Sequence, residues 1–107
     1  MERRLEKRWP RKYEVLVLFD NRVVEGSTTD VSKKGLGALF PSPLEINKEI
    51  SFSVFLPIGR QELSGELLWH KPCSDGGYHA GVHLTSVPAE YLNYTAILKY
   101  DSQNNIT

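Results

Sequence analysis

Arginines near the N-terminus are spaced in a way that suits an anionic ligand. Arg4 and Arg8 are separated by three residues, and Arg3 directly precedes Arg4. A planar guanidinium group can hold two phosphate oxygens, or the O6 and N7 atoms of guanine, through paired hydrogen bonds, and it also stacks on bases. Lys7 and Arg11 have the same spacing, but only the first pair is arginine at both positions. We therefore expect Arg4 and Arg8 to bind the ligand; the alternative is a charged segment that only keeps the protein soluble.

A second polar group follows a predicted strand. Asp30 and Ser32 are two residues apart in an extended segment, so their side chains lie on the same side of the backbone. A carboxylate accepts hydrogen bonds and a hydroxyl both donates and accepts them, so the pair can read the edge of a base. Gly35 permits a turn where a ligand can approach the backbone closely. Taken alone, these residues are also typical of an Asx or serine turn that closes a loop.

The charge of the chain is divided between the N-terminal segment and the remainder. The 13 Lys and Arg residues balance the 13 Asp and Glu residues, so the formal net charge is zero. Residues 1–12 carry a surplus of four positive charges, which leaves a surplus of four negative charges on the rest. A basic segment beside an acidic domain can be directed at a single anion. A domain that binds nucleic acid would instead spread basic residues over one face.

Strands are predicted to position these residues. Short segments rich in β-branched and aromatic residues, several of them alternating in polarity, are typical of half-buried strands. Turn residues such as Asp20-Asn21 separate the segments. Six short strands joined by turns predict an all-β fold, a small antiparallel six-stranded barrel. The predicted strands are Tyr13–Phe19, Arg22–Asp30, Ala38–Phe40, Glu49–Leu56, Gln61–His70 and Tyr78–Thr85.

One domain with a segment at each end is expected from the length of 107 residues. Pro88 and Glu90 suit the first turn of a short C-terminal helix, whose Leu92, Ala96 and aromatic neighbours are expected to cover one mouth of the barrel. No apolar run is long enough to span a membrane, and no signal peptide is present, so a cytoplasmic location is expected. The predicted parts are a flexible basic arm at 1–12, the barrel and helix at 13–98, and a polar tail at 99–107.

Candidate catalytic residues are too few to predict an enzyme. Cys73 is the one cysteine, so it has neither an internal disulfide partner nor the matching ligands of a zinc site. His79 and His83 are four residues apart, which suits zinc on a helix, whereas here they lie in a predicted strand. No phosphate-binding glycine loop and no nucleophile with a base is evident. We therefore expect a binding protein with no cofactor and no metal.

Together, the two polar segments resemble the RxxxR and [D/N]xSxxG motifs of the PilZ domain family. Arg4-Leu5-Glu6-Lys7-Arg8 matches the first motif, and Asp30-Val31-Ser32-Lys33-Lys34-Gly35 matches the second. Trp9-Pro10 before the first strand and Ala80-Gly81-Val82-His83-Leu84 in the last strand extend the likeness over roughly residues 3–98. The resemblance implies a receptor for the bacterial second messenger cyclic di-GMP, with a β-barrel and an N-terminal switch loop.

The resemblance also implies roles for single residues in ligand binding. Arg4 and Arg8 would grip guanine and phosphate, and Arg3 before the motif implies two stacked ligand molecules, an intercalated dimer. The second motif would read a guanine edge through its carboxylate and hydroxyl, while its glycine shapes the turn. Trp69 is expected to lie under a base. The implied ligand-binding residues are thus Arg3, Arg4, Arg8, Asp30, Ser32, Gly35 and Trp69.

Ordering of the arm on binding is expected to pass the signal to a protein partner. The resemblance implies a partner in the regulation of motility, exopolysaccharide synthesis or pili. Two alternatives stay open: a small barrel that binds single-stranded nucleic acid, and a PilZ-like adaptor that does not bind nucleotide. The acidic balance of the barrel disfavours nucleic acid, and the intact motif residues count against the adaptor.

Overall fold

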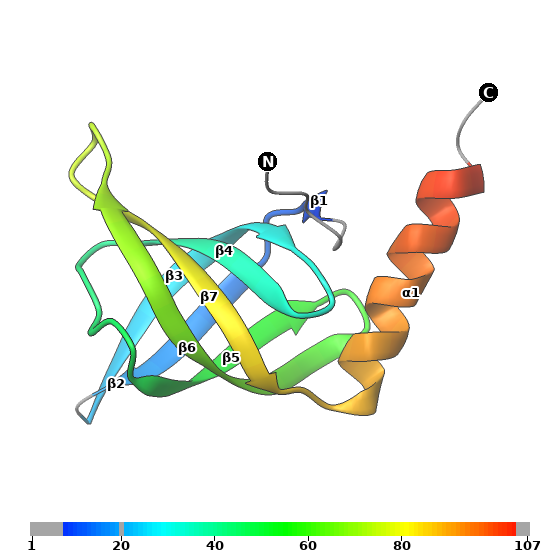
Figure 1. The fold of residues 1–107 in the computed structure, drawn as a ribbon, viewed down its shortest axis with the longest axis horizontal. Coiled ribbons are helices and arrows are strands. Elements are labelled where there is room, and N and C mark those ends of the chain that lie inside the picture. The colour runs from blue at the N-terminus through cyan, green and yellow to red at the C-terminus, as the bar shows by residue number, and fades with distance from the viewer. Residues whose placement is uncertain (1–7, 20, 105–107) are drawn as a thin grey trace, which may run out of the picture.

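A closed barrel of antiparallel strands forms the centre of the computed structural model, which describes residues 8–19 and 21–104 (Figure 1). The sheet order is β1-β3-β2-β5-β6-β7-β4, and pairing of β3 with β4 closes the ring. The predicted six-stranded barrel is therefore confirmed, with one additional strand, β1. The strands are β1 (Trp9–Pro10), β2 (Glu14–Phe19), β3 (Arg22–Val31), β4 (Gly35–Phe40), β5 (Glu49–Leu56), β6 (Gly59–Pro72) and β7 (Tyr78–Ser86).

Apolar side chains from all six barrel strands fill the interior. Val15 and Val17 on β2 alternate with more exposed neighbours, as expected for a strand with one buried face. Phe52 on β5 is also fully buried, opposite Val17 in the register of the two strands. Because the ring is closed, the barrel strands have no unpaired edge.

Gly26 lies where β3 and β4 pass closely. A Cβ atom at this position would lie 2.3 Å from the carbonyl oxygen of Leu39 and 2.5 Å from the ring of Phe40. The β3–β4 register shifts further along, between Thr28 and Asp30. Gly26 is thus required for close packing of the two strands.

We expect Gly26→Ala to lower the free energy of unfolding by about 2 kcal/mol, because the added methyl group meets a backbone oxygen that the sheet holds in place. Gly76→Ala is the control. Gly76 has a φ of 98°, and a Cβ there would have nothing within 4 Å, so only backbone strain of about 1 kcal/mol applies. Urea unfolding followed by circular dichroism measures both losses. A loss at Gly26 no larger than that at Gly76 would contradict this account.

Part of the predicted arm belongs to the sheet. β1 pairs with the end of β3, with Trp9 opposite Val31 and Pro10 opposite Asp30. Trp9 is only 7% exposed, because its indole enters the core. The chain immediately after Arg8 is therefore anchored to the barrel. Residues 1–7, which make up the rest of the predicted arm, lie outside the described residues.

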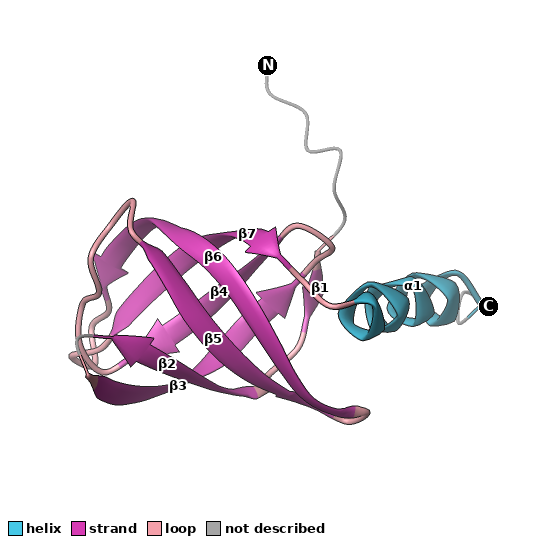
Figure 2. Cartoon of the chain, turned by 90° about the horizontal axis from the view of Figure 1, so that it is seen from below, coloured by secondary structure: helices cyan, strands magenta, loops and turns pink. Residues whose placement is uncertain are grey.

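The helix α1 (Ala89–Asn104) begins beside the barrel and extends beyond one end of it (Figure 2). It is longer than predicted and includes the first six residues of the predicted polar tail, because no glycine or proline follows Leu98 to end it. Within the described residues, no helix is long and apolar enough to cross a membrane.

Two tyrosines determine which face of α1 meets the barrel. Tyr91 and Tyr94 are buried, which confirms the predicted aromatic contribution, whereas Leu92 and Ala96 are exposed, so their predicted place against the barrel was wrong. Tyr91 donates a hydrogen bond of 2.7 Å from its hydroxyl to the backbone carbonyl of Ser32. The Tyr94 hydroxyl shares a hydrogen bond with that of a tyrosine just before β2. Aromatic side chains with satisfied hydroxyls bury a large area without leaving a polar group unpaired.

Candidate functional site

The two predicted motifs meet at the end of β3. Arg8 lies just before β1, and Asp30 is opposite Pro10 in the pairing of β1 with β3. Arg8 Nη1 donates a hydrogen bond of 2.5 Å to Asp30 Oδ1, and the two side chains are 32% and 28% exposed. The short strand β1 thus brings residues 22 positions apart into an ion pair that is still reachable from solvent.

Ser32 and Gly35 close the turn that joins β3 to β4. The backbone N–H of Ser32 donates to the Gly35 carbonyl at 2.9 Å, and the backbone N–H of Gly35 donates to Ser32 Oγ at 3.0 Å. Ser32 is completely buried. Its hydroxyl therefore bonds to the turn, as expected if these residues form a serine turn that closes a loop.

Gly35 also makes room for the guanidinium group of Arg8. A Cβ atom on Gly35 would lie 3.3 Å from Arg8 Nη2 and 2.8 Å from the backbone oxygen of Val82. A side chain here would press on both the arginine and the neighbouring strand. The absence of a side chain at Gly35 thus lets Arg8 lie close to the turn.

A surface floored by glycines extends from Asp30 across the outside of the barrel. Asp30 is opposite Gly37, Gly37 is opposite Gly81, and Gly81 is opposite Trp69. Residues paired in this way lie on one face of a sheet. We call Gly37 and Gly81 the glycine floor. It has a carboxylate at one end and an indole at the other, and the side chains of Thr29 and Asp30 lie over Gly37 while the indole of Trp69 lies over Gly81.

Trp69 lies flat on the glycine floor. A Cβ atom on Gly81 would lie 2.3 Å from Trp69 Nε1 and 2.8 Å from its Cζ2, so the indole occupies the space of a missing side chain. The side chain is still 39% exposed. The ring of His79 meets it edge-on, with centroids 5.2 Å apart. Trp69 was predicted to bind the ligand, and in the structure it lies on the same outer face of the barrel as Asp30.

Thr29 and His79 extend the site and were not predicted to belong to it. Thr29 Oγ1 donates to Asp30 Oδ2 at 3.2 Å and lies 3.2 Å from His79 Nε2. Because a hydroxyl carries one hydrogen, His79 Nε2 is the donor in the second contact. Thr29 thus contacts Oδ2 of Asp30 and is itself contacted by His79, while Arg8 contacts Oδ1 of Asp30. His79 was expected to lie in a strand, but no signal in the sequence linked it to Thr29.

The remaining predicted arginines are placed differently. Arg3 and Arg4 lie outside the described residues. Arg11, from the alternative spacing with Lys7, is exposed, and its Nη1 donates to the backbone carbonyl of Pro10 at 2.7 Å. Among the arginines that the structure describes, Arg8 is the one that contacts the second motif. Within residues 8–19 and 21–104, no three His, Cys, Asp or Glu side chains gather as metal ligands.

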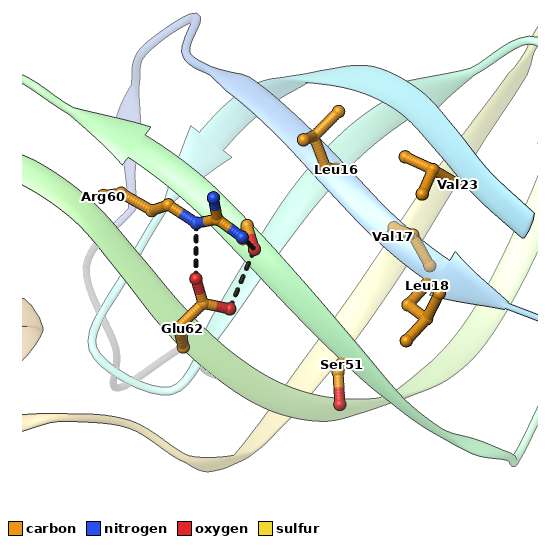
Figure 3. A pocket seen from close by; sticks show the side chains of 8 residues that line it. Leu16, Val17, Leu18, Val23, Ser51, Arg60 and Glu62 are labelled. Atoms are coloured by element: carbon orange, nitrogen blue, oxygen red, sulfur yellow. Dashed lines mark hydrogen bonds and ion pairs between the residues drawn. The ribbon is translucent and has the colours of Figure 1, made fainter.

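A cavity of 240 Å³ lies on the barrel wall formed by β2, β3, β5 and β6 (Figure 3). Leu16 and Leu18 form its apolar wall. On its polar wall, Ser53 Oγ donates to one oxygen of Glu62 at 2.8 Å, and Arg60 Nε donates to the other at 2.5 Å. The Ser53 hydrogen bond, aided by Arg60, lowers the pKa of Glu62. None of the predicted site residues lines this cavity, so it is separate from the site on the glycine floor.

The comparisons with known proteins agree on one fold. The family model described as PilZ domain matches residues 2–97, whereas comparison with curated protein sequences gives no match. The inhibitor of motility MotI/DgrA of Bacillus subtilis has a TM-score of 0.80 at 11% identity, over 100% of this chain and 54% of that chain. Escherichia coli YcgR in complex with c-di-GMP has a TM-score of 0.78 at 16% identity, over 97% and 47%.

A third structure, the PilZ domain of Escherichia coli YcgR with c-di-GMP, has a TM-score of 0.69 at 14% identity. It covers 98% of this chain and 100% of that chain. The chain thus spans about half the length of the first two proteins and the whole of the third. At these identities the likeness to the solved structures establishes the fold.

Proposed function

This chain belongs to the PilZ domain family, and from that membership we propose that it is a receptor for cyclic di-GMP. The observation that carries the proposal is the meeting of Arg8 and Asp30, one from each family motif, beside the turn at Gly35. Complexes of two structural neighbours with c-di-GMP support the choice of ligand. Family membership also supports a receptor over an enzyme.

We propose that the ligand lies across the glycine floor. The N1–H and N2–H groups of guanine are donors, and Asp30 offers a carboxylate whose oxygens can accept them beside the bonds from Arg8 and Thr29. The guanidinium group of Arg8 supplies a fork for phosphate or for the O6 and N7 edge. The open face of Trp69 supplies a stacking surface for a base. The ligand would rest on the side chains of Asp30 and Trp69, which lie over Gly37 and Gly81.

Ser32 acts in this proposal by holding the turn, because its hydroxyl is bonded to Gly35. Arg3 and Arg4 precede Arg8 by five and four residues, and in this proposal they add positive charge to the ligand site. Arg3 suits a second stacked ligand molecule. Folding of the arm over the ligand costs entropy and creates a new surface. That surface would pass the signal to a protein partner, and likeness to an inhibitor of motility supports a partner in motility.

Isothermal titration calorimetry of the 107-residue chain tests the proposal. We expect binding of cyclic di-GMP and much weaker binding of GMP and of cyclic di-AMP, because adenine lacks the N1–H donor that the Asp30 carboxylate requires. A short single-stranded oligonucleotide at about 0.1 M and about 1 M salt is the second comparison. Tighter binding of the oligonucleotide, weakening steeply with salt, would favour the nucleic-acid barrel. Binding of no nucleotide would favour the adaptor.

A further inference from the structure

We propose that Lys71 is a second cationic contact of the site and holds the ligand phosphate on the side of the glycine floor away from Arg8. The inference rests on the proposed function, because it assumes that a dinucleotide with two phosphates lies across this floor. Lys71 belongs to neither motif. A second cationic contact would let the site bind a ligand with two phosphates more tightly than a ligand with one.

Lys71 is positioned by the same strand as Trp69. The two residues are two apart on β6, so their side chains leave the same face of the sheet. Lys71 Nζ lies 5.4 Å from the centroid of the indole ring, within the range of a cation–π contact. In register, Lys71 is opposite His79 and next to the pair of Trp69 with Gly81. A base stacked on the outward face of Trp69 would take the place of the ammonium group over the ring, and the exposed Lys71 side chain could then turn to the phosphate of the ligand.

The charge of Lys71 is available to a ligand. Within the described parts of the chain, Lys71 makes no ion pair, whereas Arg8 is paired with Asp30 and Arg60 is paired with Glu62. Its side chain is exposed, so an anion can reach it without a change in the fold. An unpaired cation held beside an aromatic ring is suited to an anionic group attached to a stacked base.

The two cations lie toward opposite ends of the glycine floor. From Asp30 on β3 to Trp69 on β6 there are three strand spacings, through β4 and β7, or about 14 Å along the sheet. Arg8 serves the β3 end of this surface, and Lys71 serves the β6 end. A ligand with one phosphate can use one of these cations, whereas a cyclic dinucleotide can use both. We infer that Lys71 contributes to the preference for cyclic di-GMP over GMP.

The test compares Lys71→Gln with Lys71→Arg in calorimetric titrations of the 107-residue chain with cyclic di-GMP. We expect Lys71→Gln to weaken binding about five- to tenfold, the size of one charged contact that is partly exposed, and Lys71→Arg to retain wild-type affinity. Repeating the titrations at about 0.1 M and about 1 M salt should show a smaller loss of affinity with salt for Lys71→Gln than for wild type. Lys48→Gln is the matched control, because Lys48 is exposed and paired with Glu45.

Two results would overturn the inference while leaving the proposed function intact. One is unchanged affinity and salt dependence in Lys71→Gln, which would assign the second phosphate to the arm. The other is an equal loss of affinity for cyclic di-GMP in Lys48→Gln, which would mean that removal of any positive charge weakens binding to this extent. If the wild-type chain does not bind cyclic di-GMP, the proposed function itself is wrong, and the inference is overturned with it.

Discussion

Replacing Arg8 with alanine is expected to abolish measurable cyclic di-GMP binding, with a loss of affinity of about 100-fold or more. The variant removes a charge-assisted contact to the ligand and leaves the Asp30 carboxylate without its counter-charge in a site that must accept an anion. The fold should survive, because a partly exposed ion pair contributes about 1 kcal/mol or less to stability. Calorimetry measures the affinity, and thermal unfolding checks the fold.

Arg11→Ala is the matched control for this prediction. Arg11 is an arginine three residues from Arg8, but it is exposed and bonded to the carbonyl of Pro10. We expect this variant to bind with an affinity within about threefold of wild type, because removal of an exposed charge has small effects. If Arg11→Ala lost binding while Arg8→Ala kept it, the alternative spacing of Lys7 with Arg11 would be the correct motif.

Trp69→Ala is expected to weaken cyclic di-GMP binding about ten- to 100-fold, through loss of the stacking surface for one base. Gly81→Ala should reproduce much of that loss although Trp69 remains, because the new methyl group would lie 2.3 Å from the position of Trp69 Nε1 and must displace the ring. Similar losses of affinity in the two variants would show that binding needs the indole in this position, because Gly81→Ala keeps the indole but displaces it. Calorimetric titration measures both affinities.

Leu68→Ala is the control for these two variants. Leu68 precedes Trp69 on β6 and is 49% exposed, so its removal shortens an accessible apolar side chain beside the site. Affinity should stay close to that of wild type. Unchanged affinity in Trp69→Ala would contradict the stacking role, and a loss in Leu68→Ala equal to that in Trp69→Ala would point to a general disturbance of β6.

Much of the barrel could be predicted because its strands carry local signals. Val15 and Val17 belong to a short segment rich in β-branched and aromatic residues, and a positive φ of 61° at Asn21 fits the predicted turn. The face of α1 could not be predicted, because Tyr91 and Leu92 are neighbours in a segment with apolar residues on both sides of the helix. The hydrogen bond from Tyr91 to Ser32 joins residues far apart in sequence and decides between the two faces.

Single residues of the candidate site could be named from local motifs and from the family resemblance, but most contacts between them could not. Asp30 and Gly35 form a local motif, and their roles at a strand end follow from residue type. The contact of Thr29 with His79 depends on how β3, β4 and β7 pair around the ring, and no local pattern determines that register. The flat surface at Gly37 and Gly81 likewise exists only because the two glycines are register partners.

An NMR titration of the isotope-labelled chain with cyclic di-GMP tests the central claim most directly, because it reports the location of the ligand as well as its binding. We predict shifts of the backbone amides of Gly35, Gly37 and Gly81 and of the indole N–H of Trp69, all along the glycine floor. The amide of Ser53, in the separate cavity on the barrel wall, should not move. Shifts centred on Ser53, or no shifts at saturating ligand, would contradict the account.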